Sequence, residues 1–402
     1  MKLLGNIVDQ GLSSATNLLV SLFSAHLLDI TSFGVVGVAM ATYFVFVGLG
    51  RAVVGDPLLL SHGDPTAGLR GGTVDQAVSA AFGVGVLFAA ACAVGSYVLR
   101  GHGIGVLLVL GAGLPFLLLQ DVARYIAFWR GRPWLAAAND LLWLVGSLGA
   151  LVLLPRAQAS AASVLACWVG SGAVAGLVFV VHLRWRPGVR AGWSWMRANR
   201  TLIGPLLGDY GLIALLQQGV VYVITGVAGL RATAAFRGAL VALGPVNVLT
   251  TGVSVFLVQL ARRSYDAAPA TFPVVMLRRS AAMALAVMTL CLAVYAMPTQ
   301  LGELLLNDVW TTSRPLVLPL AFVFATAALN FGATTGLRVI GEAARSFRVR
   351  MIAAPLMLGI VAAACYQGGV FAAVVAQAVT GAVATSLWWW TFLAAHRRRV
   401  PG

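Results

Sequence analysis

The sequence has little charge for its length. Only 10% of its 402 residues are Asp, Glu, Lys or Arg, whereas an ordinary soluble domain has about 25%. It has 12 acidic residues, and Lys2 is the only lysine among its 27 basic residues. Hydrophobic residues make up 60% of the chain, and the mean hydropathy is +0.92. These values exclude an ordinary soluble enzyme and indicate a multi-pass membrane protein.

The sequence also lacks the usual signatures of catalysis and metal binding. It has no P-loop, no GxSxG elbow and no HExxH motif, and its five histidines are scattered. Its four cysteines lie in different apolar runs without metal-ligand spacing, which disfavours a disulfide framework or a zinc site. We therefore expect no enzyme activity, no catalytic residue, no cofactor and no bound metal.

Long apolar runs occupy most of the chain. A helix needs about 20 mostly apolar residues to cross a bilayer, and the sequence contains about twelve such runs. We therefore expect an all-α fold with about twelve transmembrane helices. They lie near residues 11–28, 33–53, 77–99, 104–123, 134–154, 163–182, 202–227, 234–258, 280–298, 315–337, 351–367 and 370–393.

A basic segment at residues 184–200 separates these runs into two groups of six. It contains five arginines and no acidic residue, which is typical of a cytoplasmic loop. Of the 27 basic residues, 21 fall in the termini and loops on the side of this segment, and five fall on the other side. We therefore expect both termini in the cytoplasm. The Trp and Arg residues of the segment favour a membrane edge over a nucleic-acid patch.

The predicted organisation has four parts. They are an N-terminal six-helix lobe at 1–182, a basic cytoplasmic linker at 183–200, a C-terminal six-helix lobe at 201–393 and a basic tail at 394–402. Because each lobe has an even number of spans, both lobes start on the same side of the membrane. This predicts a parallel repeat, as in one transporter architecture. The longest outer loop is expected at 299–314, which is thin for a catalytic site.

Charged residues within or near the spans are the main candidates for function, because charge is costly in a membrane. A helix rises about 1.5 Å per residue, which places Arg51 and Arg124 near the inner boundary. Asp121 lies one turn from Arg124 on the same face, and Asp140 can converge with them. Arginine forks suit phosphate oxygens; snorkelling or a structural ion pair is the alternative. The diphosphate-binding candidates are Arg51, Arg124 and Arg237, and the ion-coupling or ion-pair candidates are Asp121, Asp140 and Asp209.

Uncharged polar residues in the spans indicate either a hydrated substrate path or hydrogen bonds between helices. The candidates for lining such a cavity are Gln10 and Asn17 in the first span and Gln217 and Gln218 in the seventh. Two breaks are also expected. Gly244-Pro245 should bend the eighth span, and Gly368-Gly369 should separate the last two.

Seven short segments share a pattern with one family. They are Asp9–Asn17, Phe33-Gly34, Gly50–Leu58, Gln120–Tyr125, Arg130–Pro133, Asp140–Trp143 and Gly244–Leu249. In these segments the chain resembles the Wzx-type polysaccharide flippases of the multidrug and oligosaccharidyl-lipid/polysaccharide exporter superfamily, in particular actinobacterial polysaccharide biosynthesis proteins. The resemblance implies two six-helix lobes, a central cavity and alternating access without a nucleotide. It also implies a substrate on an undecaprenyl diphosphate carrier.

Together, these features predict a flippase of the bacterial plasma membrane. It would move an undecaprenyl-diphosphate-linked oligosaccharide from the inner to the outer leaflet for polysaccharide or cell-envelope assembly. The expected partners are that lipid-linked oligosaccharide and membrane lipids, with polysaccharide polymerase machinery as a further candidate and no nucleic acid. Two alternatives stay open: an ion-coupled small-molecule or drug exporter of the same superfamily, and a polytopic glycosyltransferase or ligase.

Overall fold

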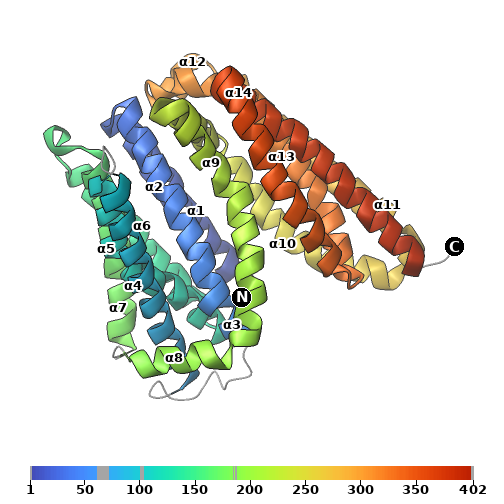
Figure 1. The fold of residues 1–402 in the computed structure, drawn as a ribbon, viewed down its shortest axis with the longest axis horizontal. Helices are drawn as coiled ribbons and strands as arrows, with labels where there is room; N and C mark the ends of the chain where they lie inside the picture. The colour runs from blue at the N-terminus through green and yellow to red at the C-terminus, as the bar shows by residue number, and fades with distance from the viewer. Residues whose placement is uncertain (1, 61–71, 100–103, 184, 186–187, 400–402) are drawn as a thin grey trace. The chain divides into compact units, whose positions relative to one another are not determined.

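The computed structural model describes residues 2–60, 72–99, 104–183, 185 and 188–399 (Figure 1). Within these ranges the chain is helical, and no strand is present. The expected all-α fold is therefore confirmed. The hydrophobic runs become helices because a buried or lipid-facing backbone has to satisfy its own N–H and C=O groups.

The chain forms two compact units, Met1–Ala214 and Leu215–Gly402. Each unit has its own hydrophobic core. The boundary between the units falls inside helix α9 (Arg200–Ala242), whereas the sequence places the boundary between the lobes at 183–200. That division into lobes and linker stays a prediction.

The first unit is built around α5 (Ile104–Trp129), which contacts its neighbours α4, α6 and α7. Most of α5 is buried, so the charged side chains on this helix lie inside the unit. The other elements of the unit are α1 (Lys2–Leu27), α2 (Ile30–Gly50), the π-helical turn η1 (Arg51–Gly55), α3 (Asp56–Leu60), α4 (Thr73–Leu99), α6 (Pro133–Leu153), the 3-10 turn η2 (Arg156–Gln158), α7 (Ala161–His182), α8 (Val189–Ala198) and the first part of α9.

The second unit is built mainly from long helices, with α11 and α13 packed together and α13 packed against α14. After the end of α9 it contains α10 (Gly244–Ala267), the 3-10 turn η3 (Pro269–Thr271), α11 (Phe272–Tyr295), α12 (Thr299–Leu306), α13 (Val309–Val339) and α14 (Ala343–Arg399). The predicted outer loop at 299–314 is wrong in detail, because α12 and the first turns of α13 occupy most of it.

Nine helical segments among the described residues are long and apolar enough to cross a membrane. Two of them contain a break at glycine: α9 leaves helical geometry at Gly229, and α14 leaves it at Gly368 and Gly369. The helix also breaks at Leu243, where Gly244 and Pro245 restart it as α10. Both breaks expected from the sequence are thus confirmed. With these breaks, and with α1 and α10 as further helices, the twelve predicted spans all fall on helix.

Two turns show that the units share a local backbone pattern. The α5–α6 turn has Gly131 at φ 67°, and the α13–α14 turn has Gly341 at φ 75°. In each turn the residue after the glycine donates its N–H to a carbonyl five residues earlier, over 2.8 Å in both cases. This is the Schellman ending of a helix, which favours glycine at the left-handed position. The two glycines are 210 residues apart, which agrees with the predicted repeat.

The basic segment folds in part as helix α8, which Figure 1 shows running across the ends of the long helices of the first unit. It packs against α4, with Trp195 buried and Trp193 exposed. Helix α7 ends at His182, and α8 begins at Val189. Residues 184, 186 and 187 lie outside the described residues.

Candidate functional site

The first unit contains a chain of buried ion pairs that joins α1, η1, α5 and α6. Arg51 Nη2 lies 2.7 Å from Asp121 Oδ1. Arg124 lies 2.6 Å from Asp9, 3.5 Å from Asp140 and 3.8 Å from Asp121. We call this set of five residues, together with Gln120, the ionic network. The sequence-based expectation that Arg51, Arg124, Asp121 and Asp140 converge is confirmed.

Arg51 is the most accessible member of the ionic network. Its Nε and Nη2 atoms donate to both oxygens of Asp121, at distances between 2.7 and 3.2 Å. Its side chain is still 34% exposed, whereas that of Asp121 is 7% exposed. The third nitrogen, Nη1, takes no part in this pairing. A second ligand can therefore approach the guanidinium without first breaking the ion pair.

Arg124 is enclosed by carboxylates. Its side chain is 9% exposed, and it donates through Nε and Nη2 to one oxygen of Asp9, at 3.2 and 2.6 Å. The same Nε also faces Asp140, and the i,i+3 spacing on α5 brings Asp121 to its Nη1. A phosphate could reach this arginine only after a carboxylate had moved away.

The ionic network has more acids than bases. Asp9, Asp121 and Asp140 face only two arginines, so the five residues carry a formal charge of −1 when all are ionised. Gln120 donates to Asp140 Oδ1 over 2.6 Å. This hydrogen bond stabilises the negative charge of Asp140 but does not neutralise it. Three buried oxygens of the ionic network have no hydrogen-bond donor among the described residues: Asp9 Oδ1, Gln120 Oε1 and Asp140 Oδ2. A buried excess charge is costly, so this site favours the uptake of a proton or a small cation.

The remaining candidates lie elsewhere. Asp209 is half-buried on α9, next to Tyr210, whose side chain hydrogen-bonds to Asp56. Asn17 lies on α1, and its side-chain oxygen is buried without a hydrogen bond. The side chain of Gln10 lies outside the described residues. The other three, Arg237, Gln217 and Gln218, belong to the second unit.

Four positions of the ionic network can be compared with the second half of the chain. A shift of 210 residues, taken from the two glycine turns, identifies the equivalents of Gln120, Asp121, Arg124 and Asp140. These positions hold Asn330, Phe331, Thr334 and Arg350. Asp121 and Asp140 therefore have no acidic equivalent at these positions of the second half.

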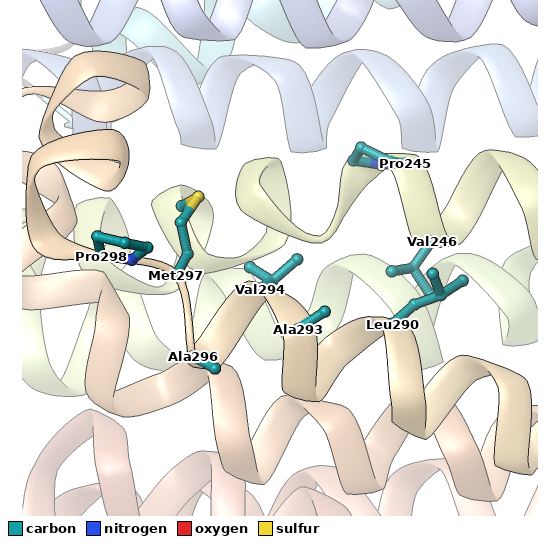
Figure 2. Close-up of a pocket in the computed structure, with 8 residues that line it drawn as sticks. All are labelled: Pro245, Val246, Leu290, Ala293, Val294, Ala296, Met297 and Pro298. Carbon is teal, nitrogen blue, oxygen red and sulfur yellow. The ribbon is translucent and has the colours of Figure 1, made fainter.

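A pocket of about 470 Å³ lies in the second unit between the start of α10 and the end of α11 (Figure 2). All of its lining side chains are apolar, so it offers no group for binding a charged headgroup. They are Pro245, Val246, Leu290, Ala293, Val294, Ala296, Met297 and Pro298. This pocket and the ionic network thus belong to different units of the chain.

Asp9 and Gln120 were not predicted from the sequence as members of the site. The first span was expected to start at residue 11, which left Asp9 outside the membrane helix. In the structure α1 starts at Lys2, so Asp9 lies two turns inside the helix and is 1% exposed. The available signal was an acidic residue directly before an apolar run, within the Asp9–Asn17 segment.

Solved structures share this arrangement of helices. An inward-facing multidrug resistance MATE family transporter of the MOP superfamily matches with a TM-score of 0.71 and 12% identity, covering 97% of this chain and 96% of that one. The lipid II flippase MurJ, in an inward closed conformation, matches with a TM-score of 0.72 and 10% identity, covering 96% and 87%. The fold is that of MOP-superfamily transporters.

A MOP superfamily transporter from Pyrococcus furiosus also matches, with a TM-score of 0.57 and 12% identity over 99% and 96% of the two chains. By their names, the three neighbours are transporters and a flippase rather than enzymes. No protein-family model matches the sequence, and no curated protein does. At these identities the likeness establishes the fold of a multi-pass membrane protein, and the transported substrate has to be argued from the residues.

Proposed function

We propose that this chain is a flippase that moves an undecaprenyl-diphosphate-linked oligosaccharide from the inner to the outer leaflet, and that Arg51 binds the diphosphate. The observation that supports this most directly is the geometry of Arg51. Its guanidinium is held by Asp121 along one edge, while one third of the side chain stays exposed. An arginine in a membrane helix is costly, and a free guanidinium edge matches phosphate oxygens in geometry and charge.

In this proposal Arg51 is the first residue to contact the diphosphate, and Arg124 has an indirect role. Three carboxylates surround it, so it orders the ionic network and becomes a second phosphate ligand only if Asp121 shifts. The excess carboxylate provides the coupling: one proton on Asp140, or one sodium ion among the oxygens that lack a hydrogen bond, neutralises the network. Arrival of the negative diphosphate at Arg51 would then favour uptake of that cation.

Export of surface polysaccharide in a deletion strain tests this function, with membrane abundance measured for every variant. We expect Arg51→Gln to abolish export and Arg51→Lys to keep part of it, because lysine retains the charge but not the planar fork. Arg262→Gln is the matched control. It removes an arginine whose pair with Asp266 is exposed, at 64% and 55%, and it should leave export unchanged. Full export by Arg51→Gln at normal abundance would refute the diphosphate role.

An ion-coupled exporter of small molecules is the second candidate. The negative excess of the ionic network favours it, because a buried anionic site also attracts an organic cation. Transport by purified protein in vesicles separates the two candidates. Uptake of a cationic dye that competes with the lipid-linked oligosaccharide would support the exporter, whereas movement of the lipid that the dye does not affect supports the flippase.

A further inference from the structure

The π-helical turn η1 begins at Arg51. Within this turn, the carbonyl of Val53 cannot accept the backbone hydrogen bond that an α-helix normally provides. The oxygen of Val53 would accept an α-helical hydrogen bond from residue 57. Residue 57 is proline, which has no N–H. The turn instead closes over five residues, with Asp56 N–H donating to Arg51 C=O. Such π turns occur often at functional sites.

A side chain from the distant helix α8 supplies a donor to that carbonyl. The indole N–H of Trp195 donates to Val53 C=O over 2.9 Å, across 142 residues of sequence. Trp195 is 2% exposed, and it belongs to the same buried cluster as Val53, Val54 and Ile203. A buried carbonyl without a donor is costly, so this bond matters to the shape of the turn.

Close packing fixes α8 in place. A Cβ atom at Gly192 would lie 3.2 Å from the backbone of Ser79 and Ala80 on α4, so the small residue lets the two helices touch. Trp185, just before α8, donates its indole N–H to Ser79 Oγ over 3.2 Å. Trp193 faces outward and is 64% exposed. The basic segment at residues 184–200 therefore has one tryptophan directed at η1, one directed at α4 and one directed away.

We infer that Trp195 is a positioning residue for Arg51. Through the Val53 carbonyl it stabilises the π turn, and the turn sets the direction in which the Arg51 side chain leaves the helix toward Asp121. If the turn relaxed to α geometry, the helix on its two sides would rotate relative to each other by roughly 100°, the angle of one residue. The importance of this for transport rests on the proposed function of Arg51.

Two variants test this bond. One removes the donor of the bond, and the other supplies a competing backbone donor for the same carbonyl. Trp195→Phe keeps a buried ring and removes the N–H donor. Pro57→Ala keeps Trp195 and restores the backbone N–H that an α-helical turn needs. We expect both to lower export about tenfold, and we expect Pro57→Ala to raise the melting temperature, because proline inside a helix is destabilising. If Trp195 only filled space in the core, Pro57→Ala would not be expected to raise the melting temperature and lower export together.

Amide hydrogen exchange of the peptide covering 50–58 gives a readout that does not depend on transport. Trp195→Phe should speed exchange there, whereas the matched control Trp185→Phe should not, since its bond goes to Ser79. When Arg51→Lys is already present, adding Trp195→Phe should lower export little further. Both changes act through Arg51, and effects that share one residue are not additive. Unchanged exchange in Trp195→Phe, or full export by Pro57→Ala, overturns the inference. Normal export by Arg51→Gln instead overturns the proposed function, whatever the exchange shows.

Discussion

Asp121 accepts hydrogen bonds from Arg51 through both of its carboxylate oxygens. The same carboxylate lies 3.8 Å from Arg124, so it is the link between the accessible arginine and the enclosed one. Any movement of Arg51 toward a substrate therefore changes the charge that Arg124 experiences. In the proposed function, Asp121 is therefore the residue through which substrate binding at Arg51 would affect cation binding in the ionic network.

The first prediction concerns that link. Asp121→Asn should lower the free energy of unfolding by about 2 kcal/mol, below the usual cost of breaking a fully buried pair because Arg51 is partly exposed. The double variant Arg51→Gln with Asp121→Asn should regain most of this stability, since it removes both charges of the pair and leaves the net charge of the network unchanged. It should still fail to export polysaccharide. Thermal unfolding in detergent and export in cells measure the two effects, and export by the double variant would mean that the pair is only structural.

The second prediction concerns Arg124. From the sequence, Arg124→Leu with Asp140→Leu is expected to fold but not to export. The structure adds Asp9, which that double variant leaves without its cation. We therefore expect the double variant to be lost from the membrane or to melt early. Adding Asp9→Asn should restore its abundance, as seen by size-exclusion chromatography of a fluorescent fusion. Equal abundance of the double and triple variants would contradict this.

The third prediction concerns topology. The basic segment and the C-terminal arginines should face the cytoplasm, because 21 of the 27 basic residues fall on that side. Single cysteines at positions 190 and 400, in a variant without the four native cysteines, should resist an impermeant thiol reagent in intact cells. They should react after the cells are permeabilised. Labelling from outside would reverse the predicted orientation.

The fourth prediction concerns the start of α2. Asp29 caps this helix by accepting from the N–H groups of Thr31 and Ser32, so Asp29→Ala should cost about 1 kcal/mol. Hydrogen bonding from Ser32 lowers the pKa of Asp29. The cap therefore stabilises the fold above the unfolded pKa, near 4, and the contribution is lost as the pH falls through the lower folded value. The melting temperatures of wild type and variant should therefore converge as the pH falls through the lowered pKa of Asp29 in the folded state; a constant gap would contradict this.

The fifth prediction concerns the break in α9. Gly229 has φ 83° and ψ 179°, a region open almost only to glycine, so Gly229→Ala should cost about 1–3 kcal/mol. Nothing lies within 4 Å of a Cβ at this position, so strain and not collision would be the cause. Gly226→Ala is the matched control, because that position is helical and equally open. It should be neutral or slightly stabilising, and equal losses in both variants would argue against backbone strain.

Much of the fold followed from the sequence, for physical reasons. Helices have a fixed rise, so the depths of Arg51, Arg124 and Asp140 could be counted from the ends of their spans, and their convergence was predicted. Glycine and proline break helices locally, so the interruptions near Pro245 and Gly369 were also predictable.

What the sequence did not reveal depends on contacts between distant segments. Asp9 was missed because the end of a helix is hard to place where apolar character fades gradually. The hydrogen bond from Trp195 to Val53 joins positions 142 residues apart, and no local sequence pattern predicts it. The proline at 57 does show that a carbonyl lacks its donor, but it does not say which side chain supplies one.

The pairing of Asp9 with Arg124 also affects how the protein is assembled. The two residues are 115 positions apart. Helix α1 is therefore synthesised before Arg124, the residue whose positive charge pairs with Asp9. Over the described residues, α1 is not one of the nine segments apolar enough to cross a membrane by itself. At roughly 5–20 residues per second, the wait is on the order of ten seconds. We therefore expect α1 to reach its final place only after α5 has been made, when Asp9 can pair with Arg124.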